Sequence, residues 1–98
     1  MKIDVTQPLV GYNGEPIQNG ANTALTLRAA CCEALTGAYP DEKLSGEEKV
    51  RRFELARLLH AEDEPDVCVE DIALVKQLIG KGYGPMVVGP AWSLLDPK

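Results

Sequence analysis

The chain has 98 residues, which is enough for one domain and too few for two, and 45% of them are hydrophobic, as in an ordinary globular domain. Its formal net charge of −5 argues against direct binding to nucleic acid or to an anionic membrane surface, because both rely on clustered Lys and Arg side chains. The apolar runs are much shorter than the ~20 residues needed to cross a bilayer. We therefore expect a single domain over residues 1–98 that binds neither nucleic acid nor membrane.

The cysteines and the opening residues indicate a reducing compartment. Three cysteines is an odd count, and Cys31 and Cys32 are adjacent, which is not the disulfide framework of a small secreted domain. The opening Met1-Lys2-Ile3-Asp4 carries an early acid and no apolar core segment follows, so we expect no signal peptide. Together these features predict a cytoplasmic protein.

The first predicted element is a β-hairpin within residues 1–20. Asn13-Gly14 is typical of a tight hairpin turn, because both residues tolerate a positive φ. Pro8 and Pro16 have no N–H to donate, so both strands would be edge strands. A lone two-stranded hairpin is marginally stable in water. We expect it to pack on the rest of the chain or to pair with another copy in a homo-oligomer.

A helical region is predicted over residues 26–96, and its first helix follows Thr26, a candidate N-cap. Gly37 stands where a helix commonly ends in a left-handed residue. The apolar stripe of this helix consists of Leu27, Ala30, Cys31, Ala34 and Leu35.

The second predicted helix has the clearest start signal. Ser45 and Glu48 form a capping-box pattern, and the helix should end near Ala61, ahead of Pro65. We expect its apolar side to consist of Val50, Phe53, Leu55, Leu58 and Leu59.

The third helix is predicted from about Val69 to Ile79, with a wide apolar face that makes it the helix we expect to be most buried. A short fourth helix should begin with Pro85 at its first position and kink or break at Pro90. The predicted fold class is mainly α (α+β): an N-terminal β-hairpin followed by three to four packed helices.

No residue pattern predicts catalysis, a bound metal or a cofactor. Cys31-Cys32 lacks the two- to four-residue spacer of structural zinc sites, and an apolar stripe is where free cysteine behaves as a small hydrophobe. A metal or catalytic site built from Cys31, Cys32, Cys68 and His60 would need long-range convergence and is a remote alternative. The glycines of residues 80–84 follow a helix pattern, so they match neither a dinucleotide fingerprint nor a P-loop.

A run of acids is the strongest charge feature, with Glu62, Asp63, Glu64, Asp66, Glu70 and Asp71 inside ten residues. It is either a solvated loop with favourable helix-start charges or an acidic patch that docks a basic protein surface. Trp92 is either a core anchor or an interface hot spot. The candidate partner-binding residues are Tyr12, Asn13, Glu62, Asp63, Glu64, Asp66 and Trp92.

Several segments resemble a group of small proteins encoded in tailed phages and prophages. They are Leu44–Ala56 (LSGEEKVRRFELA), Glu70–Lys81 (EDIALVKQLIGK), Gly84–Trp92 (GPMVVGPAW) and the Asn13–Ile17 turn ahead of Thr26-Leu27. The shared motifs are caps, turns and apolar faces, so the resemblance implies a fold and a phage context and no catalytic residues. Cys68, where Ser or Thr would be expected as N-cap, and Pro90 depart from the pattern.

The functional hypothesis is a non-enzymatic phage or prophage accessory protein that binds another protein, of host or phage, as a regulator or inhibitor. The alternative is a virion-assembly component, such as a tail-assembly chaperone or a self-associating structural subunit. A small enzyme or metal protein using the cysteines and His60 is the remote third hypothesis.

Overall fold

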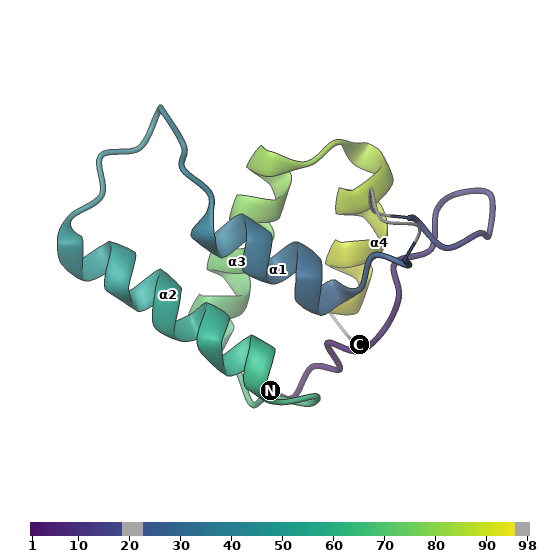
Figure 1. Ribbon diagram of the computed structural model, residues 1–98, viewed down its shortest axis with the longest axis horizontal. Helices are drawn as coiled ribbons and strands as arrows, with labels where there is room; N and C mark the ends of the chain where they lie inside the picture. Colours follow the sequence, from purple (N-terminus) through teal and green to yellow (C-terminus); the bar gives the residue numbers. More distant parts are fainter. Residues whose placement is uncertain (19–22, 96–98) are drawn as a thin grey trace.

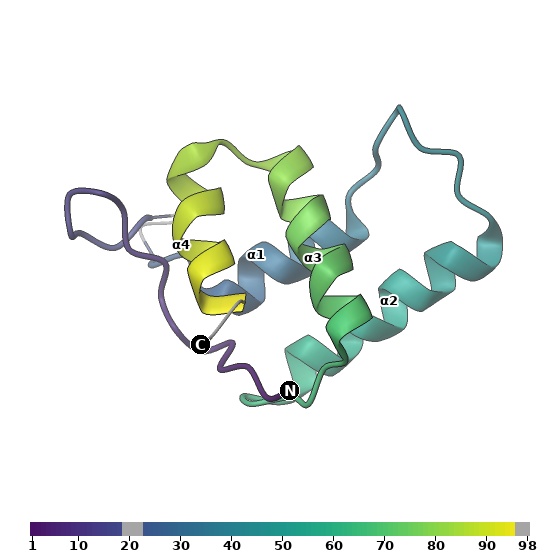
Figure 2. The same ribbon diagram turned by 180° about the vertical axis from the view of Figure 1, so that it is seen from behind.

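The computed structural model of the protein describes residues 1–18 and 23–95, and these residues form four helices joined by loops (Figure 1). The helix α1 lies at the centre and packs against the other three helices, and α3 also packs against α4 (Figures 1 and 2). The prediction of a mainly helical fold is therefore confirmed. The bounds are α1 (Leu27–Thr36), α2 (Gly46–Ala61), α3 (Val69–Gly82) and α4 (Pro85–Leu95).

The core surrounds α1. This helix buries Leu27, Ala30, Cys31, Ala34 and Leu35, which confirms the predicted stripe. The longer α3 buries Ile72, Val75, Leu78 and Ile79. The prediction that the third helix is the most buried is wrong, because α1 is covered by three helices and by the N-terminal residues Ile3, Val5 and Leu9.

Local sequence signals set the helix starts. The Thr26 hydroxyl accepts a hydrogen bond from the Ala29 amide, and the Ser45 hydroxyl accepts one from the Glu48 amide, both at 3.2 Å. Pro85 occupies the first position of α4. Each of the two hydroxyls satisfies an amide that has no partner inside its helix. Proline suits the first helical position because it has no N–H there to satisfy.

Two predictions about helix ends are wrong, and the break predicted as one alternative at Pro90 is absent. Gly37 adopts an extended conformation, with φ −70° and ψ 153°, and is not left-handed. The helix α3 continues past Ile79 to Gly82, and the Tyr83 amide then donates to the Ile79 carbonyl at 3.0 Å. The helix α4 runs through Pro90 without a break. A proline removes one helical hydrogen bond, but burial of Ala91 and Leu95 holds the second half of α4 on the core.

The apolar face predicted for the second helix is only partly correct. The helix α2 buries Leu55, Ala56 and Leu59, whereas Val50 and Phe53 are exposed. Arg52, one of the two residues between them, is buried instead. Its buried ion pair, described below, is the tertiary contact that the helical periodicity could not reveal.

The predicted N-terminal β-hairpin is not confirmed. Residues 1–18 contain isolated antiparallel bridges and no strand ladder. Val10 pairs with Pro16 across a turn in which Gly14 has φ +81°. The prolines Pro8 and Pro16 lack the N–H donors that a longer ladder would need.

A ring of backbone hydrogen bonds takes the place of the hairpin. The Leu9 amide donates to the Leu25 carbonyl at 2.8 Å, and the Leu25 amide donates to the Ile17 carbonyl at 2.7 Å. The Ile17 amide closes the ring on the Leu9 carbonyl at 2.8 Å. The backbone amide of each of these three residues, which are spaced eight apart, thus finds a carbonyl partner on another. The side chains of Leu9 and Leu25 are buried in the core.

The first seven residues tie the α2–α3 loop to the start of α1. The segment runs antiparallel to residues 63–67, with bonds such as the Val5 amide to the Asp63 carbonyl at 3.0 Å. The carbonyls of Val5 and Gln7 then accept the amides of Arg28 and Leu27, both at 2.9 Å. These bonds satisfy first-turn amides of α1 that would otherwise lack partners.

Among the described helices, none has both the length and the apolar character that a membrane span requires.

Candidate protein-binding surfaces

The acidic stretch occupies the α2–α3 loop and the first turn of α3, and half of its six acids have cationic partners within the chain. Asp63 binds Arg28 at 2.6 Å and Asp71 binds Arg51 at 2.7 Å. Asp66 binds the amino group of Met1 at 2.6 Å, and this bond lowers the pKa of the Asp66 carboxyl. Glu62 and Glu64 are exposed. Three acids of the stretch are therefore engaged within the chain, and Glu62 and Glu64 face solvent.

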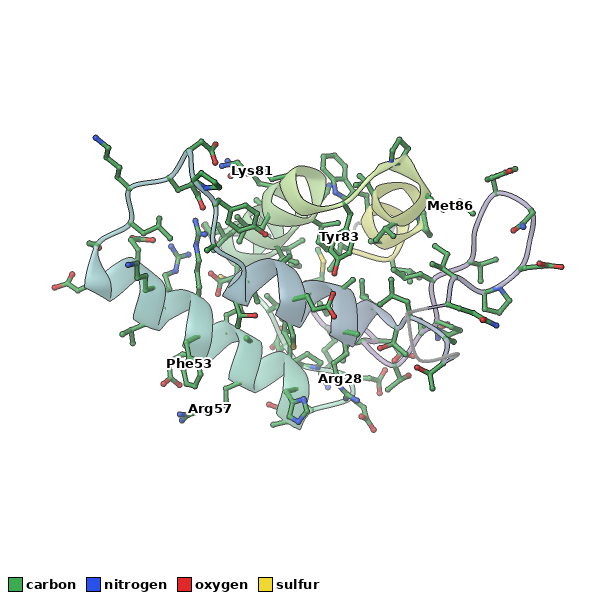
Figure 3. The ribbon with its side chains drawn as sticks, turned by 45° about the horizontal axis from the view of Figure 1, so that its top comes forward. Arg28, Phe53, Arg57, Lys81, Tyr83 and Met86 are labelled. Atoms are coloured by element: carbon green, nitrogen blue, oxygen red, sulfur yellow. The ribbon has the colours of Figure 1, made fainter. Side chains whose placement is uncertain are left out.

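Arg28 is a structural residue that the sequence did not reveal. Its guanidinium extends from α1 to the C-terminal end of α2, where Nε donates to the Leu59 carbonyl and Nη2 donates to the Glu62 carbonyl, both at 3.0 Å (Figure 3). A cation is favourable at this end of a helix, where carbonyls lack intrahelical partners. Arg28 and Leu59 lie 31 positions apart in the chain, so no local pattern links them.

Tyr12 is 93% exposed, the highest fraction among the exposed large hydrophobic side chains of the described residues. It stands beside Val10 and Met86, two further exposed apolar side chains, at a groove of about 450 Å³. None of the lining residues is charged. We call this surface the Tyr12 groove; its residues are Val10, Gly11, Tyr12, Pro85, Met86, Gly89 and Pro90.

The Tyr12 groove depends on a close approach between the N-terminal turn and α4. A Cβ atom at Gly11 would lie 2.6 Å from Met86 Cε, so a larger residue there would displace the flexible end of the Met86 side chain. Asn13 shapes the turn, since its side-chain oxygen accepts the Glu15 amide at 3.1 Å. Tyr12 and Asn13 are candidates that the sequence also named, whereas Met86 was not predicted because it lies far away in the chain.

Trp92 is half-buried between α3 and α4, at 40% exposure. Its Nε1 donates to the Lys76 carbonyl at 3.0 Å, and the Lys76 ammonium lies 4.9 Å from the ring centroid. Trp92 also lines a groove of about 400 Å³, in which Met1 and Val69 are exposed. We call this surface the Trp92 groove; it is lined by Met1, Val69, Ile72, Ala73, Lys76, Gln77, Trp92 and Leu95.

The cysteines lie in three different environments. Burial raises the pKa of Cys31 to about 12, so its thiol is protonated at neutral pH. Burial also raises the pKa of Cys32, which donates to the Ala56 carbonyl at 3.5 Å. Cys68 is exposed at the start of α3. Across residues 1–18 and 23–95, no group of three or more His, Cys, Asp or Glu side chains is arranged to hold a metal ion.

Comparison of the chain with protein-family models, with curated proteins and with solved structures finds no significant match.

Proposed function

We propose that this chain is a non-enzymatic accessory protein of a phage or prophage, which acts in the host cytoplasm by binding another protein as a regulator or inhibitor. The phage context rests on the resemblance of residues 44–56, 70–81 and 84–92 to phage-encoded chains. The observation that carries the binding role is the Tyr12 groove, where a nearly fully exposed tyrosine lies beside exposed methionine and valine.

The composition of the Tyr12 groove supports a protein partner. Aromatic residues and methionine are enriched, and charged residues depleted, at the cores of protein interfaces. The turn that carries Tyr12 is held by bonds from the Gly11 amide to the Glu15 carbonyl at 2.9 Å and from the Gly14 amide to the Gly11 carbonyl at 3.0 Å. A turn that is already ordered loses little conformational entropy on binding, which favours affinity.

The exposed acids Glu62 and Glu64 give the proposal a second element. They lie on the α2–α3 loop, away from the Tyr12 groove. Exposed acids of one sign accelerate association with a basic surface and contribute less to the final affinity. Asp63 and Asp66 contribute less to this patch, because both are engaged within the chain.

The experiment is affinity capture of the tagged chain from host cells with and without phage, with binding of the recovered partner then measured on purified proteins. Tyr12→Ser and Met86→Ser should each weaken the interaction at least about tenfold, as expected for an interface hot spot. Val50→Ser, at an exposed valine on α2, is the matched control and should leave the affinity unchanged. Glu62→Lys with Glu64→Lys should mainly slow association.

An affinity that is the same for Tyr12→Ser, Met86→Ser and the native chain would remove the Tyr12 groove from the proposal. Loss of binding in Val50→Ser alone would transfer the interface to the exposed face of α2. Circular dichroism of each variant shows whether its fold is retained.

Virion assembly by self-association is the second candidate function, and the Trp92 groove is the observation that favours it. This groove and the Tyr12 groove both border α4 and are formed by different residues. Contact between two unlike patches on successive copies builds rings or open assemblies. Sedimentation at rising protein concentration should then show growth beyond a dimer, reduced by Trp92→Ser; a constant monomer mass would argue against this candidate.

A further inference from the structure

A third hollow of the surface lies at the far end of the molecule from the Tyr12 turn. It is a cleft of about 560 Å³ lined by the end of α1, the α1–α2 loop (residues 37–45) and the first half of α2. Figure 1 shows where this loop and α2 lie. We call it the α1–α2 cleft. None of its lining residues belongs to either groove described above, so the inference drawn from it does not depend on the function proposed above.

Ion pairs hold the α1–α2 cleft in place. Both terminal nitrogens of Arg52 donate to the Glu42 carboxylate at 2.9 Å, which fixes the loop to α2. Lys81 on α3 donates to Asp41 at 3.3 Å and lies 3.5 Å from Glu42 (Figure 3). The Tyr39 hydroxyl donates to the Ala34 carbonyl at 2.7 Å. The walls are therefore organised before any ligand arrives, which lowers the entropic cost of binding.

The charge of the α1–α2 cleft is opposite to that of the whole chain. Its lining contains one acid, Glu42, against three bases, Lys43, Lys49 and Arg52, so its formal charge is +2 in a chain of −5. Arg52 and Lys81 neutralise Glu42. The exposed lysines Lys43 and Lys49 thus leave an excess of positive charge among the residues that line the cleft.

Apolar side chains form the rest of the wall. Leu35, Leu44 and Phe53 line the cleft. Phe53 is the one phenylalanine in the chain and is 54% exposed, although burying a phenylalanine side chain is worth about 1.5–3 kcal/mol. The Arg57 guanidinium lies 5.3 Å from the Phe53 ring centroid and adds a cation beside it (Figure 3).

We propose that the α1–α2 cleft binds an acidic segment of a partner protein that carries an aliphatic or aromatic side chain among its carboxylates. The carboxylates would meet Lys43 and Lys49, and the apolar side chain would lie against Leu44 and Phe53. Charge complementarity selects this occupant, since the remainder of an acidic chain repels such a segment and the cleft attracts it.

The test is a titration of the full chain, labelled with ¹⁵N, with the acetylated and amidated peptide Glu-Glu-Leu-Phe-Glu-Glu. We expect saturable amide shifts confined to residues 35–53. Lys49→Glu should weaken peptide binding at least about fivefold. Lys2→Glu makes the same charge change beside the loop that follows α2, away from the cleft, and should leave peptide binding unchanged. Glu-Glu-Ser-Ser-Glu-Glu should bind at least about fivefold more weakly, because it lacks the apolar anchor.

Three results would overturn the proposal. The first is the absence of saturable shifts at millimolar peptide, and the second is an equal loss of affinity from Lys49→Glu and Lys2→Glu. The third is equal binding of the peptide Lys-Lys-Leu-Phe-Lys-Lys. Shifts of residues 35–53 that grow with protein concentration before any peptide is added would assign the cleft to a second copy of this chain instead.

Discussion

Arg52 and Glu42 form a bidentate ion pair in which both N–O distances are 2.9 Å. The side chains are 6% and 15% exposed, so the pair is largely shielded from water. A planar guanidinium matches a carboxylate in this geometry better than a lysine could. The pair joins the α1–α2 loop to the inner face of α2, and it explains why a charged residue occupies a buried position on that helix.

Glu42 gives folding stability a pH dependence. Hydrogen bonds from Arg52 lower the pKa of Glu42 from 4.5 to about 2. Between these values the unfolded chain binds a proton that the folded chain does not, so this stabilisation is complete above pH 4.5 and is lost as the pH falls toward 2. We predict that Glu42→Gln reduces the slope of the urea midpoint against pH in this range.

The measurement is urea unfolding followed by circular dichroism from about pH 7 to about pH 3. Glu47→Gln, at an exposed acid in the first turn of α2, is the control and should retain the native slope. A Glu42→Gln profile parallel to that of the native chain would contradict this prediction.

Arg28 should contribute to stability mainly through backbone carbonyls. Arg28→Gln removes the donors to the Leu59 and Glu62 carbonyls, and we expect a loss of about 1–3 kcal/mol in the free energy of unfolding. Asp63→Asn should cost less than about 1 kcal/mol, because exposed ion pairs contribute little and the Asp63 side chain is 76% exposed. Denaturant unfolding of both variants gives the comparison, and an equal loss would show that the ion pair itself is the stabilising contact.

Cys68 is an N-cap that makes no side-chain hydrogen bond to α3. Its backbone already has the extended conformation of a cap, with φ −73° and ψ 160°. Cys68→Ser should therefore supply an acceptor for a first-turn amide and raise the free energy of unfolding by about 0.5–1 kcal/mol. Cys68→Ala is the matched control, and an equal midpoint for the two variants in urea would show that no cap bond forms.

Replacing Gly14 and Gly46 by alanine should change the free energy of unfolding in opposite directions. A Cβ added at either position would have no neighbouring atom within 4 Å, so steric contact does not distinguish the two glycines. Gly14 has φ +81°, and Gly14→Ala should cost about 1 kcal/mol in backbone strain. Gly46 begins α2, and Gly46→Ala should stabilise by about 0.4–1 kcal/mol. Thermal unfolding measures both, and changes of the same sign would contradict the conformational argument.

The sequence by itself determined where the helices begin and which stripe of α1 enters the core. The hydroxyls of the caps Thr26 and Ser45 accept hydrogen bonds from amides three residues ahead. Pro85 favours a helix start because its ring fixes a helical φ and it has no N–H that needs a partner. Such interactions are local, so the residues that make them are visible in a few neighbouring positions. The turn at Asn13-Gly14 was likewise predicted from the sequence, and Gly14 there has φ +81°.

The tertiary structure alone decided which polar residues are buried and which apolar residues face outward. Arg52 is buried because Glu42 reaches it from the loop, and Phe53 is exposed beside it. Arg28 meets the end of α2, and Met86 meets the turn of Gly11 and Tyr12. The predicted hairpin is not confirmed, and Leu9, Ile17 and Leu25 bond to one another in a ring. Each of these contacts joins residues that do not belong to one helix or strand, and periodicity describes only neighbours within one element.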